Sequence, residues 1–348
     1  MILKRSKAGS IFCIWVLTAV WSQAAAAQLP TPKSPIYKVI ELPLRRLYIN
    51  DSGEVVGMVQ EVQLSDKGVV LGTGKRHAAL WTEKDGLRIL PTMKGYSESE
   101  ARGYNQAGHA VGWAIDSSDE RGPQAFIYQN RKLVALPGHN SKALAINDSD
   151  DIVGQAIVKG TGPAMPVLWH EASVRDLGGC CGGVANAINK SGQVVGNMYD
   201  QNGQYRAFLW DQSRGIKYFG AADNDSTAVS INERGHVLVQ EFDSGVFIYE
   251  GKGTAVRVKI PTSLPVQARS INGADVVVGD CGAYSDVAVA FRWDETNGYR
   301  DLNTLIPTGS GWRLESATSI NNRGQIVGVG EHDEKNAGYL LMEQDHGH

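Results

Sequence analysis

The segment AINKSGQVVG at residues 187–196 decides the fold, because seven related segments run through the chain. Each has an asparagine after a hydrophobic or aromatic residue, then a few polar or glycine residues, then a β-branched run. Successive asparagines are 40 to 55 residues apart, and spacings of this size indicate a repeat architecture. The asparagines are Asn50, Asn105, Asn147, Asn189, Asn232, Asn272 and Asn321.

Two further motifs recur with the same spacing as the first. A run such as RAFLW, ending at Trp210, follows each asparagine by about twenty residues, and a run such as IKYFG, beginning at Ile216, comes next. Aromatic and β-branched runs of this length, bounded by Gly, Pro and Asn, are typical of strands. Four strands in roughly forty residues predict one propeller blade, an arrangement that leaves only short, protected sheet edges.

We therefore predict an all-β fold, a seven-bladed β-propeller of four-stranded antiparallel blades. The last repeat supplies only three strands, to Leu341, while VIELP at 39–43 resembles the fourth-strand run LRILP at 87–91. Pairing of the N- and C-terminal strands is expected to complete the last blade and close the ring. An insertion at 64–72 accounts for the longest spacing, in the first blade.

The repeated asparagine is expected to begin a hairpin turn. Its side chain can bond to the backbone two residues on, and a following glycine suits the left-handed conformation of such turns. The alternative is a calcium loop, since residues 147–151 read NDSDD. Other copies read NKSG and NERG, with cations in place of acids, so the turn is the preferred interpretation and no metal site is predicted.

Small residues precede the asparagines at alternate positions, for example Ala143 and Ala145. Alternation predicts that both lie on one face of the innermost strand, where blades crowd around the axis. The first repeat differs, because Arg46 and Tyr48 stand at these positions. Either an irregular terminal blade or a functional feature would account for the difference.

The N-terminus predicts export. Lys4, Arg5 and Lys7 precede an apolar stretch that is too short to span a bilayer, and small residues follow up to Ala27. The predicted organisation is a signal peptide at 1–27, a linker at 28–35, the propeller at 36–343 and a disordered tail at 344–348. The mature protein is expected to be secreted or periplasmic, with no membrane span.

The combination of AINKSGQVVG, RAFLW and VRDLG resembles the HAF family of extracellular bacterial repeat proteins. The family is named for a His-Ala-Phe triplet in the aromatic strand. Here HAALW at His77 keeps the histidine, whereas QAFIY and RAFLW keep Ala-Phe. The resemblance covers the mature chain and implies an exported repeat protein, but it brings no catalytic residues.

Composition, cysteine content and the absence of known motifs limit the classes of function and site that the sequence supports. A net charge of −3, with no basic cluster beyond the N-terminus, argues against nucleic-acid binding. Three cysteines follow the leader, and the adjacent Cys180 and Cys181 are disulfide candidates, although a bond between them would be strained. His-Glu-x-x-His and Gly-x-Ser-x-Gly motifs are absent, and no cofactor is predicted.

The sequence favours a secreted, non-enzymatic binding module. Its partner would be a carbohydrate or an envelope or extracellular protein, bound where the longer loops emerge. The alternatives are an exported lyase or hydrolase acting on polysaccharide, for which a cluster of His139 with acids would speak, and a purely structural repeat. The candidate ligand-binding residues are Tyr96, Trp113, Tyr199, Tyr284 and Trp312.

Overall fold

The computed structural model describes residues 36–344, except 65–69, 117, 119–120, 161, 221–223, 251–253, 263 and 283–287. At 61–64 and 70–73 it describes the backbone alone. The predicted signal peptide, the linker and residues 345–348 of the tail lie outside the described residues. No helix in the described part has the length and apolar character needed to cross a bilayer.

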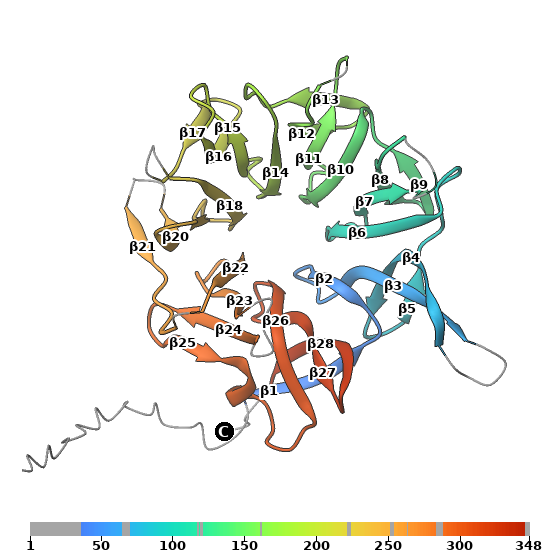
Figure 1. The fold of residues 1–348 in the computed structure, drawn as a ribbon, viewed down its shortest axis with the longest axis vertical. Coiled ribbons are helices and arrows are strands. Elements are labelled where there is room, and N and C mark those ends of the chain that lie inside the picture. Colours follow the sequence, from blue (N-terminus) through green and yellow to red (C-terminus); the bar gives the residue numbers. More distant parts are fainter. Residues whose placement is uncertain are drawn as a thin grey trace, which may run out of the picture. The chain divides into compact units, whose positions relative to one another are not determined.

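Seven four-stranded antiparallel sheets follow one another around an axis, which confirms the predicted propeller (Figure 1). Blades 1 to 7 are numbered in chain order from their innermost strands. The innermost strands are β2 (Arg45–Ile49), β6 (Glu98–Tyr104), β10 (His139–Ile146), β14 (Gly183–Ile188), β18 (Ser226–Ile231), β22 (Val266–Ile271) and β26 (Trp312–Ile320). The second strands are β3 (Val55–Leu64), β7 (Ala110–Ile115), β11 (Ile152–Ile157), β15 (Val194–Tyr199), β19 (Val237–Glu241), β23 (Val277–Cys281) and β27 (Ile326–His332).

The outer half of each blade is built from the two later motifs. The third strands are β4 (Val70–Thr82), β8 (Gln124–Gln129), β12 (Met165–His170), β16 (Tyr205–Asp211), β20 (Gly245–Tyr249), β24 (Val289–Asp294) and β28 (Lys335–Glu343). The outermost strands are β5 (Gly86–Ile89), β9 (Lys132–Ala135), β13 (Ser173–Asp176), β17 (Gly215–Tyr218), β21 (Ala255–Arg257), β25 (Gly298–Asp301) and β1 (Tyr37–Leu42). A 3₁₀ helix, η1 (Leu302–Leu305), follows β25.

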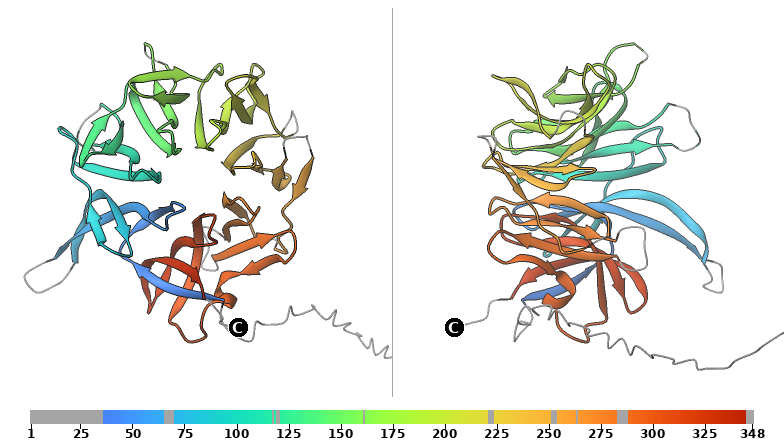
Figure 2. Two further views of the ribbon diagram at one scale, coloured as in Figure 1. Left: turned by 180° about the vertical axis from the view of Figure 1, so that it is seen from behind. Right: turned by 60° about the vertical axis from the view of Figure 1, so that its left-hand side comes forward.

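Antiparallel connections give the propeller two distinct ends. The turns between first and second strands, which contain the seven asparagines, emerge at one end, here called the hairpin face. The connections between blades, and those from second to third strands, emerge at the other end, called the loop face. The insertion at 64–72 lengthens the β3–β4 hairpin, which projects beyond the neighbouring blades in Figure 2.

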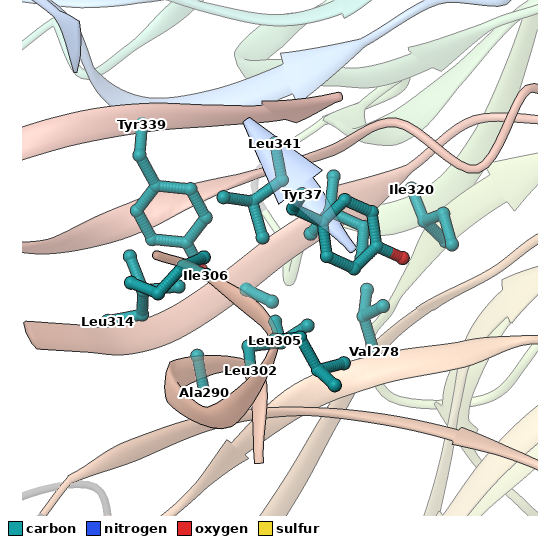
Figure 3. Packing of buried hydrophobic residues seen from close by; sticks show 12 residues of the cluster. Tyr37, Val278, Ala290, Leu302, Leu305, Ile306, Leu314, Ile320, Tyr339 and Leu341 are labelled. Atoms are coloured by element: carbon teal, nitrogen blue, oxygen red, sulfur yellow. The ribbon is translucent and has the colours of Figure 1, made fainter. Parts of the chain in front are cut away.

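The N-terminal strand closes the ring as predicted. β1 pairs antiparallel with β28, from Tyr37 opposite Glu343 to Leu42 opposite Gly338. Tyr37 is fully buried in a cluster that also contains Leu341, and its hydroxyl accepts a hydrogen bond from Arg292 at 2.8 Å (Figure 3). Because β1 and β28 come from opposite ends of the described chain, this pairing holds the first and last parts of the propeller together.

The hydrophobic core is divided among the interfaces between blades. Between blades 2 and 3, Val111 and Ala125 pack with Ala143 and Trp169. The Trp169 indole also donates to the Pro137 carbonyl at 2.7 Å, so its polar edge is satisfied. Burial of apolar surface stabilises the folded state by about 25 cal/mol per Å². Because each blade buries its apolar surface against the two adjacent blades, it needs a neighbour on both sides.

A β-bulge interrupts the register of the innermost strand before the asparagine in all seven blades. The prediction that alternate small residues share a face is therefore wrong, because the extra residue reverses the side-chain direction. Ala143 packs with Val111 of blade 2, whereas Ala145 packs with Met198 of blade 4. The expected crowding is present: a Cβ on Gly103 would lie 3.1 Å from Ala145 Cα.

The second glycine of the motif is a strand residue. β15 continues past Gly196 to Tyr199. A Cβ on Gly196 would lie 2.0 Å from the Val184 carbonyl oxygen in the bulged strand, so glycine is needed for backbone approach. Blade 5 has Val239 here, and nothing in the structure explains that exception.

The asparagine side chain forms the predicted turn bonds. In blade 4 the Asn189 Oδ1 accepts from the backbone N–H of Ser191 at 3.1 Å and of Gln193 at 3.0 Å. Gly192 follows with a φ of 74°, the left-handed conformation that the turn requires. The motif is thus a satisfied hairpin turn, as the sequence predicts.

The same side chains also join the blades in a closed ring. The Asn189 Nδ2 donates to the backbone carbonyl of Asn232 in the next blade at 3.2 Å. Equivalent bonds of 2.9 to 3.3 Å connect all seven blades, and Asn321 returns to Asn50 at 2.9 Å. This asparagine ring was not predicted.

Replacement of Asn189 by aspartate separates the two roles. Aspartate keeps an oxygen for the turn but has no Nδ2 hydrogens for the Asn232 carbonyl, which would retain only the Gly235 N–H as a donor. We expect Asn189→Asp to lower the free energy of unfolding by about 2 to 4 kcal/mol, nearly as much as Asn189→Ala, measured by urea denaturation. Asn202→Ala, at an exposed hairpin position, is the control and should be neutral. An aspartate variant as stable as the parent would show that the ring bonds contribute nothing.

The bulge and its glycine give a second prediction. Gly196→Ala should destabilise by about 3 kcal/mol, because either the new methyl group or the Val184 carbonyl must move within a packed blade. Gly162 has nothing within 4 Å of its would-be Cβ, so Gly162→Ala should leave the denaturation midpoint unchanged. Equal midpoints for both variants would contradict the close approach.

Candidate functional site

A pocket of about 160 Å³ lies on the axis at the hairpin face. It is lined by six of the seven asparagines of the ring, by the residues that precede all seven, mostly isoleucine, and by polar residues that follow. It lies at the end opposite to the loop face where the ligand was predicted. The polar residues in its lining that follow the asparagines include Asp51, Gln106, Asp148, Lys190, Glu233 and Asn322.

The polar groups of this pocket are largely used within the protein. Asp51 accepts from the backbone N–H and the Nδ2 of Asn322, each at 2.9 Å. Glu233 accepts from the Lys190 N–H at 2.9 Å, so each of these bonds joins neighbouring hairpins. A ligand there would have to displace bonds that hold the blades together, and we therefore assign the pocket to the scaffold.

A second group of residues surrounds the axis closer to the loop face. It comes from the innermost strands of blades 1, 2, 3 and 6 and from β7, and contains four cations, two aromatic rings and one buried acid. We call it the axial cation cluster. Its members are Arg46, Tyr48, Glu100, Arg102, Trp113, Lys142 and Arg269.

Arg102 is the centre of this cluster. Its guanidinium carbon lies 4.7 Å from the Tyr48 ring centroid and 5.4 Å from that of Trp113. The Lys142 ammonium lies 5.3 Å from the Trp113 ring. Cation–π contacts of this kind each contribute about 0.5 to 1 kcal/mol and help to hold the charged groups in place. Two cations therefore cover the predicted ligand residue Trp113.

The backbone of blade 1 produces the unusual part of the cluster. Arg46 has a φ of 53°, a conformation that few residues other than glycine adopt. Its side chain is 54% exposed and approaches Glu100 at 3.7 Å, whereas the equivalent alanine of blade 2, Ala101, is fully buried. Outliers of this kind cost of order 1–3 kcal/mol and are common at functional sites.

Cations outnumber acids in the cluster. Glu100 is buried and lies 3.3 Å from Arg102 Nη1, so its charge is already paired. Burial raises the pKa of the Tyr48 phenol, although the Arg102, Arg46 and Arg269 charges oppose the rise. The phenol consequently stays protonated at neutral pH, and it can donate a hydrogen bond but cannot serve as a base.

Arg269 extends the cluster to blade 6. Its Nε donates to Asp280 Oδ1 at 2.9 Å, and the Ser316 hydroxyl of blade 7 donates to the same oxygen at 2.7 Å. Within the described residues, Arg102 Nε and Asp280 Oδ2 are buried atoms without a hydrogen-bond partner. Unsatisfied buried groups are rare in proteins; six are found among the described residues, and these two belong to the cluster or bond to it.

The predicted aromatic residues belong to different blades. Tyr96, in the connection before β6, lies beneath Arg121 at 5.3 Å. Tyr199, at the end of β15, is 40% exposed and pairs with Tyr205 at 5.0 Å between ring centroids. Trp312, at the start of β26, stacks on His332 at 4.6 Å. Of the described four only Trp113 joins the axial cation cluster, and Tyr284 lies outside the described residues.

Several histidines pair with aspartates at or near the hairpin face. His109 Nδ1 lies 2.8 Å from Asp150, and His236 Nδ1 lies 3.0 Å from Asp275, both across blade interfaces. These aspartates also accept from the asparagine ring, so the pairs brace the scaffold. Across the described ranges, no group of three or more His, Cys, Asp or Glu side chains is arranged to hold a metal ion.

Sequence alone gave no sign of the cluster as a unit. Arg46 and Tyr48 were noticed because they interrupt the small-residue pattern, but Arg102, Lys142 and Arg269 lie in separate repeats. Their common position in the innermost strands, three to five residues before the asparagine, was the available signal. It becomes meaningful only when seven strands are known to face one axis.

Comparison with known proteins supports the fold. No protein-family model and no curated protein matches the chain. Virginiamycin B lyase from Staphylococcus aureus is similar, with a TM-score of 0.53 and 11% identity over 88% of this chain and 99% of that one. The β-propeller domain of the Trilobed protease from Pyrococcus furiosus has a TM-score of 0.56 and 12% identity over 86% and 95%.

A WD40 β-propeller domain, that of Doa1, is also similar, with a TM-score of 0.52 and 14% identity over 89% of this chain and 97% of that one. The three similar structures are thus a lyase, a domain of a protease and a WD40 domain. Likeness at these identities shows a shared fold and leaves activity open, since one fold carries many functions. The chain is a β-propeller.

Proposed function

We propose that this protein is an exported, non-enzymatic binding module whose axial cation cluster binds an acidic carbohydrate. The observation that carries the proposal is the position of Arg102 between Tyr48 and Trp113, with its Nε unpartnered and Arg46 and Arg269 close by. Export is part of the proposal and rests on the predicted leader at 1–27 and on the resemblance of the repeats to the HAF family.

Charge favours an acidic ligand over a neutral sugar. Because Arg102 and Lys142 cover the Trp113 ring, an incoming ligand meets guanidinium and ammonium groups before it meets the indole. Guanidinium groups bind carboxylates in a bidentate, planar geometry that suits uronic acids. The chain as a whole carries a net charge of −3, so the local excess of cations is specific to this end of the axis.

The same residues favour binding over catalysis. A polysaccharide lyase or hydrolase needs a base or a pair of free carboxyl groups near the scissile bond. In the cluster Glu100 is paired with arginines, and burial raises the pKa of Tyr48. His139, the other catalytic candidate of the sequence, has no described contact with the cluster.

The test measures binding of polygalacturonate and of neutral dextran by isothermal titration calorimetry. We expect polygalacturonate alone to bind, and more weakly as salt rises from low to physiological ionic strength. Arg46→Gly should weaken binding about tenfold, which corresponds to about 1.4 kcal/mol. Its stability should be unchanged or higher, because glycine accepts the φ of 53° without strain.

Arg88→Ala is the matched control, since Arg88 is an exposed cation on the outermost strand β5, beside Tyr128. Its affinity should equal that of the parent. Equal losses in the two variants, or no binding at low salt, would refute the site. Release of unsaturated or reducing ends during the titration would instead support the polysaccharide-acting enzyme.

A further inference from the structure

Residues 178–183 read GGCCGG and connect β13 of blade 3 to β14 of blade 4 on the loop face. The glycines on either side of the cysteines, Gly179 and Gly182, have φ values of 111° and 118°. Side chains larger than hydrogen rarely accept this backbone, so the composition permits a tight turn that presents both cysteines outward. Cys180 and Cys181 are exposed free thiols.

The two thiols are held together and against the end of β15. Their Sγ atoms lie 2.6 Å apart. The Cys180 thiol donates toward the backbone carbonyls of Asp200, at 3.1 Å, and Tyr199, at 3.5 Å. The Tyr199 N–H in turn donates to the Gly182 carbonyl at 3.2 Å, so the loop is docked at two points.

We propose that Cys180 and Cys181 are a reversible modification site, at which a low-molecular-weight disulfide such as oxidised glutathione converts the two thiols into a vicinal disulfide. One protein thiolate attacks the small disulfide, forms a mixed disulfide and displaces the first small thiol. The neighbouring cysteine then attacks the protein sulfur of the mixed disulfide and displaces the second. The protein loses two protons and two electrons, and the small disulfide gains them as two thiols.

Roles for the two cysteines follow from their contacts. The hydrogen-bonding contact with the Cys181 thiol raises the pKa of the Cys180 thiol, and the Asp200 carbonyl accepts the Cys180 hydrogen. Cys181 has no such carbonyl contact among the described residues, and we assign it the first attack and Cys180 the second. A disulfide between adjacent residues is strained, which makes it easily reduced again.

Oxidation would change the neighbouring surface. A disulfide sulfur has no hydrogen to donate, so the bonds from Cys180 to the Tyr199 and Asp200 carbonyls would be lost. Tyr199 carries an exposed ring paired with Tyr205 at this place. The modification would thus loosen the docking of the loop beside an exposed aromatic pair. It is independent of the axial cation cluster and of the ligand proposed there.

Mass spectrometry of the exported protein tests the proposal. Trypsin should release residues 176–190, which contain both cysteines, between Arg175 and Lys190. After incubation with oxidised glutathione and then an alkylating reagent, we expect this peptide to have lost two hydrogens and to carry neither label nor glutathione. Dithiothreitol should restore two alkylatable thiols. Two alkylated cysteines, two glutathione groups or a disulfide-linked dimer would each overturn the proposal.

Variants identify the intermediate and the order of attack. The Cys180→Ser variant should acquire one stable glutathione group, on Cys181. It should acquire this group faster than the Cys181→Ser variant acquires one on Cys180. The reverse order would overturn the assigned roles. Cys281 is the internal control: it is buried, its Sγ lies 3.7 Å from the Val289 carbonyl, and burial raises the pKa of its thiol. It should stay unmodified and be alkylated only after denaturation.

Discussion

The asparagine ring is the interaction on which the other features depend. Each of the seven side chains uses its oxygen within its own hairpin and its Nδ2 on the next blade, so one residue both forms a turn and sets the distance to a neighbour. Among short side chains only an amide has a donor and an acceptor on separate atoms. The spacing of strands within a repeat is therefore free to vary, whereas the asparagine must return at the same height in every blade.

Crowding near the axis is the second constraint, and it explains the rest of the motif. Seven innermost strands converge, and the bulge in each lets two residues that are separated by one position, such as Ala143 and Ala145, face opposite neighbouring blades. The bulged carbonyl then lies against the second strand, where six blades have a glycine like Gly196. Blade 1 replaces the two small residues with Arg46 and Tyr48, and only there does the innermost strand place an arginine in the left-handed conformation.

Local patterns predicted the blades, the turns and the closing strand, because each depends on residues close in sequence or on the count of strands. The Nδ2 bonds of Asn189 and its relatives were beyond such reasoning, since their acceptors lie some forty residues away and depend on how blades face each other. The pattern Ala-x-Ala predicts regular strand alternation, and it contains no residue that indicates a bulge. The axial cation cluster could not be predicted from the sequence for the same reason as the asparagine ring, because Arg102 and Arg269 come close only through the arrangement of the blades around the axis.

The two ends of the propeller differ in how much hydrogen-bonding capacity remains. At the hairpin face the amides are paired across blades, and acids such as Asp51 and Glu233 accept from neighbouring hairpins. Toward the loop face Arg102 Nε and Asp280 Oδ2 stay unpaired among the described atoms, and Arg46 is held in a strained conformation with its charge exposed. A ligand gains free energy where polar groups are fixed but not yet bonded, since it then pays neither for displacing a bond nor for ordering the groups. The groups that line the axial pocket already bond within the scaffold, and this difference is the reason that we propose the axial cation cluster, and not the pocket, as the ligand site.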